Sequence, residues 1–267
     1  MLSRIYNKRN RVLLSELVRT DFKLRYQGSI LGYAWSLLRP LMLFLILYVV
    51  FAKFLKVGDS VPHFPVYLLI GIVLWNFFAE MTSLSLGSIV GRGDLIRKIK
   101  IPRWIIVLSS SISALINLGL NLLVIAVFMI ANHVDLLQTT LWLPLLFVEM
   151  YVFSLGVSLF LAAAFVRYRD VSYIWEVTTQ GLFYLTPVLY PLALITNTSL
   201  QKLLLISPAG QIIQDSRYAL VTHQTLTTTQ VYGEAWYRII PVAITLFILL
   251  AGVFYFRRES KYFAENI

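Results

Sequence analysis

The sequence predicts an all-α membrane protein with six transmembrane helices, an N-terminal amphipathic interface helix and short re-entrant helices before the last span. Composition supports this fold class, because 58% of the 267 residues are hydrophobic and only 13% are charged, against roughly 45–50% and about 25% in soluble domains. Six long stretches nearly free of charge support it as well, since a helix needs about 20 apolar residues to cross the hydrocarbon layer. Both observations argue against a water-soluble fold.

The six predicted spans are separated by shorter polar or basic segments. They cover residues 30–52, 66–91, 104–131, 141–166, 171–190 and 239–256. Four of them carry one charged residue each: Arg39, Glu80, Glu149 and Glu176. A charge at membrane depth is costly, so we expect these side chains to face the protein interior, to pair between helices or to reach an interface. An even number of spans places both termini on the same side.

The distribution of basic residues predicts the orientation of these spans. Seventeen of the 23 Lys and Arg residues fall on one side of the predicted topology, in residues 1–29, 92–103, 167–170 and the tail 257–267. Because Lys and Arg are retained on the cytoplasmic face, both termini are predicted to be cytoplasmic. This asymmetry also accounts for the net charge of +10 without a nucleic-acid partner, since anionic lipid attracts basic residues at that face.

Residues 1–29 precede the first span and are predicted to hold an amphipathic helix in the cytoplasmic interface. One helical side of residues 10–26 collects apolar side chains, namely Leu13, Leu14, Leu17, Val18 and Leu24. Arg19 and Lys23 lie on the opposite side, which is the pattern of a helix that rests on a membrane surface.

Two connections between spans are distinctive. Residues 92–103 form a short basic loop that Pro102 ends before the third span. The outer segment, residues 191–237, is too long for a plain loop, yet its apolar stretches 192–195 and 203–206 are too short to cross a membrane. We expect short helices that enter the outer half of the membrane and return. Such backbone persists at that depth only if it is buried in protein or lines a wet cavity.

Sequence motifs of catalysis are absent. There is no GxxxxGK[ST] loop to cradle nucleotide phosphates, and neither GxSxG nor HExxH occurs. The chain has no cysteine, and its three histidines, His63, His133 and His223, are scattered. We therefore predict that the chain is not an enzyme, holds no cofactor or metal, and depends on another chain for any energy that it uses.

Five segments carry a recognisable pattern in chain order. They are YQGSILGYAWSLLRPL at residues 26–41, FPVYLLIGIVLWNFFAE at 64–80, GDLIRKIKIPRWIIVLSS at 93–110, RYRDV at 167–171 and FYLTPVLYP at 183–191. Together they resemble the ABC-2 type export permeases over nearly the whole chain. The resemblance is strongest to the branch that exports O-antigen, capsular polysaccharide and teichoic acid.

This resemblance implies a permease subunit that moves a polyprenyl-diphosphate-linked polysaccharide from the cytoplasm across the bacterial inner membrane. It implies a homodimer that works with two copies of a separate ABC ATPase, and this ATPase binds the ATP and Mg. The other expected partners are the lipid-linked glycan and membrane lipid, with no nucleic acid. In such an exporter, residues 191–237 are expected to act as a gate at the outer exit.

The loop at residues 94–103 resembles the family's coupling helix, which transmits closure of the ATPase. The residues expected to contact the ATPase are Asp94, Leu95, Ile96, Arg97, Lys98, Ile99 and Lys100, with Arg167, Arg169 and Asp170 in a second cytoplasmic turn. Apolar residues at a spacing of three to four could bury one face in a partner while the basic residues meet acids or lipid. The alternative is that these residues only anchor the topology as positive-inside charges.

Aromatic residues make up 14% of the chain. Those on spans expected to border the passage are Tyr33, Trp35, Trp75, Phe78, Tyr151, Tyr184 and Tyr190. Amphipathic rings give a sliding sugar a weakly binding surface that tolerates many registers. The alternative is ordinary packing and membrane-interface belts. Arg25 and Arg39 are the residues expected to hold the carrier diphosphate.

Three other functions remain open at this point. An ABC-2 permease could move drugs or lipids instead of glycan. An ion-driven flippase would require an essential intramembrane acid, for which Glu80, Glu149 and Glu176 are the candidates. A membrane-embedded glycosyltransferase would need clustered acids or a metal site, and the sequence places its membrane acids on three different helices.

Overall fold

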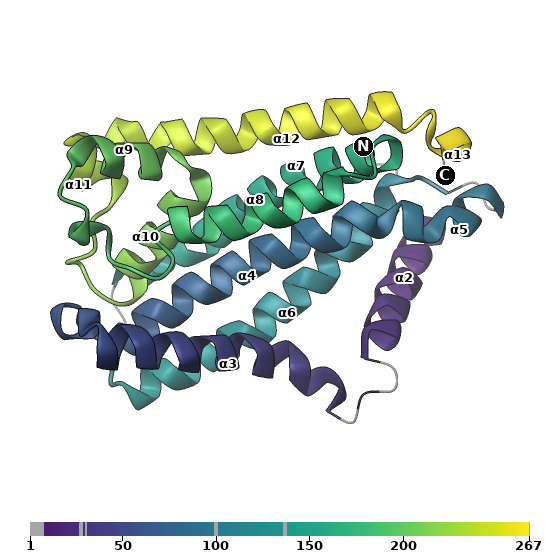
Figure 1. Ribbon diagram of the computed structural model, residues 1–267. Helices are drawn as coiled ribbons and strands as arrows, with labels where there is room; N and C mark the ends of the chain where they lie inside the picture. Colours follow the sequence, from purple (N-terminus) through teal and green to yellow (C-terminus); the bar gives the residue numbers. More distant parts are fainter. Residues whose placement is uncertain (1–7, 27–28, 30, 99–100, 136–137, 267) are drawn as a thin grey trace.

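The structure is a computed structural model that describes residues 8–26, 29, 31–98, 101–135 and 138–266. All regular elements in these ranges are helices (Figure 1). The long ones are α2 (Lys8–Tyr26), α3 (Trp35–Tyr48), α4 (Phe64–Ser88), α6 (Trp104–Ala131), α7 (Leu143–Arg167), α8 (Val171–Leu185), α10 (Pro208–Leu220) and α12 (Ile239–Glu259). The short ones are α5 (Gly93–Lys98), α9 (Thr198–Ile206), α11 (Thr228–Tyr232) and α13 (Phe263–Asn266).

Short helical turns extend several of these helices. A π-helical turn, Val49–Phe54, continues α3, and 3₁₀ turns at Gln138–Trp142 and Ala235–Arg238 lead into α7 and α12. With these turns included, five helices of the described residues are long and apolar enough to cross a membrane. They are Trp35–Phe54, Phe64–Ser88, Trp104–Ala131, Gln138–Arg167 and Ala235–Glu259. They correspond to five of the six predicted spans.

The predicted span at residues 171–190 is shorter than expected. Its helix, α8, has 15 residues and ends at Leu185, which gives about 22 Å of helix against about 30 Å of hydrocarbon. Pro187 restricts the preceding residue, and Thr186 adopts an extended conformation. The chain then continues through residues 186–189, which are buried. The prediction of a helix through residue 190 is therefore wrong.

Helix α4 forms the centre of the bundle. Every residue in 66–75 is buried, and α3, α6, α7, α8 and α10 all pack against this helix. Because α4 is apolar on all sides, it is suited to burial within protein rather than to contact with lipid on one face. Its position makes it the element around which the other helices pack.

Helices α7 and α12 pack with their backbones in contact. A Cβ added at Gly252 would lie less than 3.0 Å from the carbonyl oxygen of Gly156, and one added at Gly156 would lie 2.7 Å from backbone atoms of Leu249. Small residues allow this approach, as is usual between helices in membranes. The two glycines therefore bring α12 onto the bundle.

The two ends of the bundle differ in construction. Helices α9, α10 and α11 gather at one end, and α2, α5 and α13 gather at the other (Figure 1). Helix α2 includes the residues predicted to form the amphipathic helix, and it packs against α6. Its Leu17 is buried, while Arg19 and Lys23 are exposed, as the pattern predicts. Residues 191–237 form the helices α9, α10 and α11, which have 9, 13 and 5 residues and are too short to cross a membrane.

Candidate functional site

Helix α5 carries five of the seven ATPase-contacting residues that are predicted in the loop at 94–103. Ile96 is buried and Leu95 half-buried, whereas Asp94, Arg97 and Lys98 are exposed. The remaining two, Ile99 and Lys100, lie outside the described residues. The helix thus keeps Ile96 inside the protein and presents charges of both signs on its exposed side.

Ile96 belongs to a hydrophobic cluster that joins several helix ends. Its buried members are Ile89, Ile96, Ile106, Val107, Leu159, Ala162, Ala163, Val166, Phe256 and Phe263. Phe263 of α13 packs edge-on against Phe256 of α12, with 5.4 Å between ring centroids. This cluster therefore packs α5 against the ends of α7 and α12.

Two arginines flank the loop and form hydrogen bonds inside the protein. Arg92 forms an ion pair with Asp21 of α2 and donates to the Ser109 hydroxyl at 3.0 Å. Arg103 donates to the backbone carbonyl of Ser260. Sequence reasoning missed these contacts, because a positive-inside role already accounts for a basic residue at either position.

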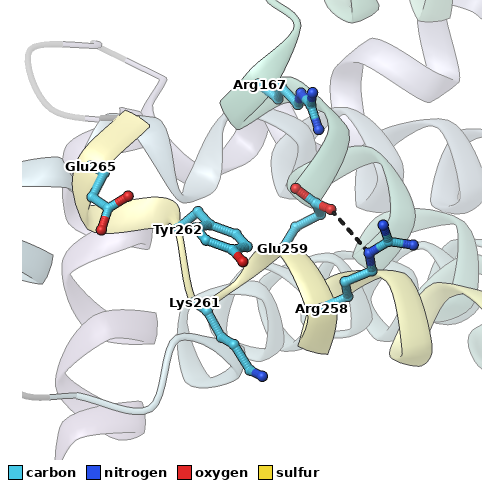
Figure 2. Close-up of a pocket in the computed structure, with 6 residues that line it drawn as sticks. All are labelled: Arg167, Arg258, Glu259, Lys261, Tyr262 and Glu265. Carbon is cyan, nitrogen blue, oxygen red and sulfur yellow. Dashed lines mark ion pairs between the residues drawn. The ribbon is translucent and has the colours of Figure 1, made fainter.

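The second predicted turn, with Arg167, Arg169 and Asp170, is exposed. Arg167 also lines a cavity of about 510 Å³ between α7 and the C-terminal segment. Figure 2 shows the other lining residues, Arg258, Glu259, Lys261, Tyr262 and Glu265. The Nε of Arg258 lies 3.9 Å from Oε1 of Glu259. Both signs of charge line this cavity, and most of its residues come from the tail.

At the opposite end, α10 carries a fully buried arginine that the sequence-based site prediction did not include. Arg217 donates to the backbone carbonyls of Tyr67 at 3.0 Å, Pro187 at 2.6 Å and Val188 at 2.5 Å. Its guanidinium carbon also lies 3.8 Å from the centroid of the Tyr67 ring, within cation–π range. One side chain thus joins α10 to α4 and to the segment that follows α8.

Asp215 forms a second anchor of α10. Its Oδ2 accepts from Arg238 at 2.8 Å and from the Gln211 side chain at 2.6 Å. Burial raises the pKa of the Asp215 carboxyl above its ordinary value, and the positive charge of Arg238 opposes that shift. The hydroxyls of Thr139 and Thr140 donate to the carbonyl of Ala219 near the end of the helix. Helix α10 is therefore fixed on several sides.

The predicted passage-lining aromatics fall into two groups. Trp75 and Phe78 are buried in the α4 core, and the Tyr151 hydroxyl lies 3.1 Å from that of Ser111. By contrast, Trp35 and Tyr184 are exposed. Half-buried Tyr190 donates from its hydroxyl to the carbonyls of Tyr184 and Leu185, and the side chain of Tyr33 lies outside the described part.

The charged residues of the spans also differ in environment. Glu80 on α4 accepts from the Asn117 amide of α6 at 2.5 Å, which makes a polar contact between helices. Glu149 is half-buried and Glu176 exposed. Of the two residues expected to hold the carrier diphosphate, Arg39 is exposed, and the Arg25 side chain lies outside the described part.

Comparison with known proteins gives a consistent result. Residues 12–221 match the family model described as ABC-2 type transporter. The chain is 28% identical over 258 residues to the O-antigen export system permease protein RfbA of Myxococcus xanthus. The aligned residues cover 96% of this chain and 96% of that protein. It is 30% identical over 179 residues to the RfbA protein of Klebsiella pneumoniae, which covers 67% of this chain and 68% of that one.

A more distant relative is the polysialic acid transport protein KpsM of Escherichia coli. It is 23% identical over 213 residues, which covers 79% of this chain and 82% of KpsM. The residues of this chain that match the family model include α5 and the first part of the outer segment, up to the end of α10.

Proposed function

The chain belongs to the ABC-2 type transporter family, and from this premise we propose that it is the membrane permease of an ATP-driven exporter of O-antigen or capsular polysaccharide. Similarity over 96% of the chain to an O-antigen export permease carries this proposal. It is a multi-pass membrane protein and a transport subunit that lacks an ATPase domain. A separate ABC ATPase associates with it and holds the nucleotide.

The membrane topology that we propose has six crossings. Helix α8 serves as the fifth, and the segment 186–190 completes its path through the membrane. Helices α9 and α10 then enter the outer half and return, which the burial of α10 supports, since every residue of Pro208–Leu220 except Tyr218 is buried. The end that holds α2, α5 and α13 faces the cytoplasm, because most of the basic residues gather there.

We propose that two copies enclose the conduit. None of the α8 side chains is buried, and Glu176 and Gln180 are exposed on it. Polar side chains at membrane depth face a wet cavity or another protein surface rather than lipid. A second copy facing α8 and α3 would supply both the protein surface and the wet cavity. A twofold axis places the same surfaces of the two copies opposite each other.

The glycan route in this proposal follows the exposed aromatics. A polysaccharide cannot cross lipid unaided, since each buried and unpaired hydroxyl costs several kcal/mol. Trp35 and Tyr184 are exposed on α3 and α8 and offer ring faces for sugars. Trp75 and Phe78 pack inside one chain, so the exposed pair supports the route better. Arg25 and Arg39 would hold the carrier diphosphate, and residues 191–237 would gate the exit.

Reconstitution tests this function directly. Vesicles that contain the chain and its ATPase should move lipid-linked polysaccharide only when ATP is added, and an ATPase variant unable to hydrolyse ATP serves as the control. Translocation by the chain alone would contradict the need for a companion. ATP-dependent movement of a drug or phospholipid, with glycan left behind, would replace the proposed cargo.

A further inference from the structure

The contact between α2 and the loop before α5 is a sheltered polar network. Arg92 forms an ion pair with Asp21, and its other terminal nitrogen donates to the Ser109 hydroxyl at 3.0 Å. The Ser109 hydroxyl also lies 3.4 Å from Oδ2 of Asp21, so the three side chains contact one another. They come from three separate parts of the chain, and the ion pair spans 71 positions in sequence.

Burial makes this network more than a surface ion pair. The Arg92 side chain is 18% exposed and that of Asp21 is 25% exposed, while Ser109 is fully buried. Exposed pairs contribute little because water and salt screen them, whereas partial burial strengthens the attraction. Reversal of one charge here would leave two like charges in a sheltered site.

The position of Arg92 lets the network connect α5 to α2. Arg92 directly precedes Gly93, the first residue of α5, so the helix with the predicted ATPase contacts begins at the next residue. Asp21 lies in the last two turns of α2, the helix that leads toward the first span. A displacement of α5 therefore reaches the end of α2 through one side-chain pair.

We propose that the Arg92–Asp21 ion pair transmits movement of α5 to α2. Each cycle of ATP hydrolysis then shifts both helices together. This inference rests on the proposed function, because α5 moves only if an ATPase acts on it. Arg92 and Asp21 are positioning residues in this scheme. Without the pair, ATP hydrolysis continues but α2 does not move with α5, so less glycan is exported for each ATP consumed.

Charge exchange tests the pair. Asp21→Arg and Arg92→Asp are each compared with the double exchange Asp21→Arg/Arg92→Asp in proteoliposomes with the ATPase. We expect each single variant to lower the glycan exported per ATP by about tenfold, and the double variant to recover to within about threefold of the unmodified chain. Glu16→Arg is the matched control, since Glu16 is an exposed acid on the same helix, and it should leave the ratio unchanged.

A second measurement follows α2 itself. The chain has no cysteine, so Ser15→Cys on the exposed side of α2 takes a single environment-sensitive fluorophore. Addition of ATP should change its emission in the unmodified chain and in the double exchange, but not in either single variant. A purely static anchor would lower the yield of folded complex without removing this response from the complex that forms.

Several results would overturn the inference. One is a single variant that keeps both the glycan-per-ATP ratio and the emission change, and another is a double exchange that recovers neither. If a reversed charge prevents folding, Arg92→Lys and Ser109→Ala take its place, and each should lower the ratio about two- to threefold because contacts are lost while the charge balance is kept. Failure of the unmodified chain to export glycan with its ATPase would instead contradict the proposed function.

Discussion

Arg217 donates hydrogen bonds to backbone carbonyls that lie outside any helix and therefore lack a helical N–H donor. The carbonyls of Pro187 and Val188 lie in the buried turn after α8, where there is no intrahelical donor for them. A buried carbonyl without a donor costs about 1–3 kcal/mol, and the guanidinium provides five N–H donors in a fixed plane. Arg217 reaches both carbonyls and that of Tyr67 as well. The irregular turn and the buried cation therefore stabilise each other.

Gly71 leaves the space that the guanidinium occupies, and this gives a prediction at the residue scale. A Cβ at position 71 would lie less than 3.0 Å from Nη2 of Arg217 and 2.6 Å from the Val188 carbonyl oxygen. Gly71→Ala should lower the free energy of unfolding by about 1–3 kcal/mol, because the neighbours must shift. The midpoint of thermal unfolding in detergent measures this change.

The same helix offers the matched control for this substitution. A Cβ at Gly87 would meet nothing within 4 Å, so Gly87→Ala should leave stability unchanged or raise it by up to about 1 kcal/mol through helix propensity. Equal midpoints for the two variants would show that the space around Arg217 adapts freely, and that the hydrogen bonds described for Arg217 do not need this glycine.

At the scale of elements, hydropathy predicts the long helices well. The spans predicted at 66–91 and 104–131 are found as Phe64–Ser88 and Trp104–Ala131, because a long run of apolar residues marks both membrane depth and helix. The end of α8 was misplaced because residues up to 190 remain apolar after the chain has left helical geometry. Hydropathy reports the surroundings of a residue, whereas Pro187 determines the backbone.

The candidate site was predictable only where local spacing sets it. Its spacing predicts Ile96 as an apolar residue that becomes buried among the charges of α5, but Ile96 packs within this chain and not in a partner. The pairing of Arg92 with Asp21 could not be read from the sequence, because it depends on how α2 packs against α6. The role of Arg217 has no sequence signal either, because its partners are backbone carbonyls of distant segments. Such contacts between distant segments need the fold before they can be recognised.

Contact between α7 and α12 gives a prediction at this scale. Gly252→Val would place side-chain atoms where the Gly156 carbonyl now lies, so the two helices must separate. We expect a loss of roughly 2–4 kcal/mol in stability, seen as a lower unfolding midpoint and a smaller yield of monodisperse protein. Ala251→Val, on the exposed neighbouring position, should change neither measurement appreciably. Comparable losses for both variants would mean that added volume on α12 matters more than backbone contact.

At the scale of the whole molecule, the exposed faces of α8 and α12 differ in polarity, and this decides whether lipid can cover them. The outer faces of α8 and α12 are both exposed. The exposed side chains of α12 are apolar between Ile239 and Phe254, whereas α8 exposes Glu176, Thr178 and Gln180 among its apolar residues. Lipid can cover the first surface but not the second without leaving polar groups unpaired. This asymmetry is what the proposed assembly of two copies explains.

Accessibility to water distinguishes the two surfaces. In the cysteine-free chain, Gln180→Cys on α8 and Leu250→Cys on α12 each introduce one reactive thiol on an exposed position. A membrane-impermeant maleimide reacts with thiolate, which forms readily in water and hardly at all in hydrocarbon. We therefore expect Cys at position 180 to be labelled at least about tenfold faster than Cys at position 250 in proteoliposomes. Equal and slow labelling at both positions would place α8 against lipid, and the conduit would then have to be formed by another surface of the chain.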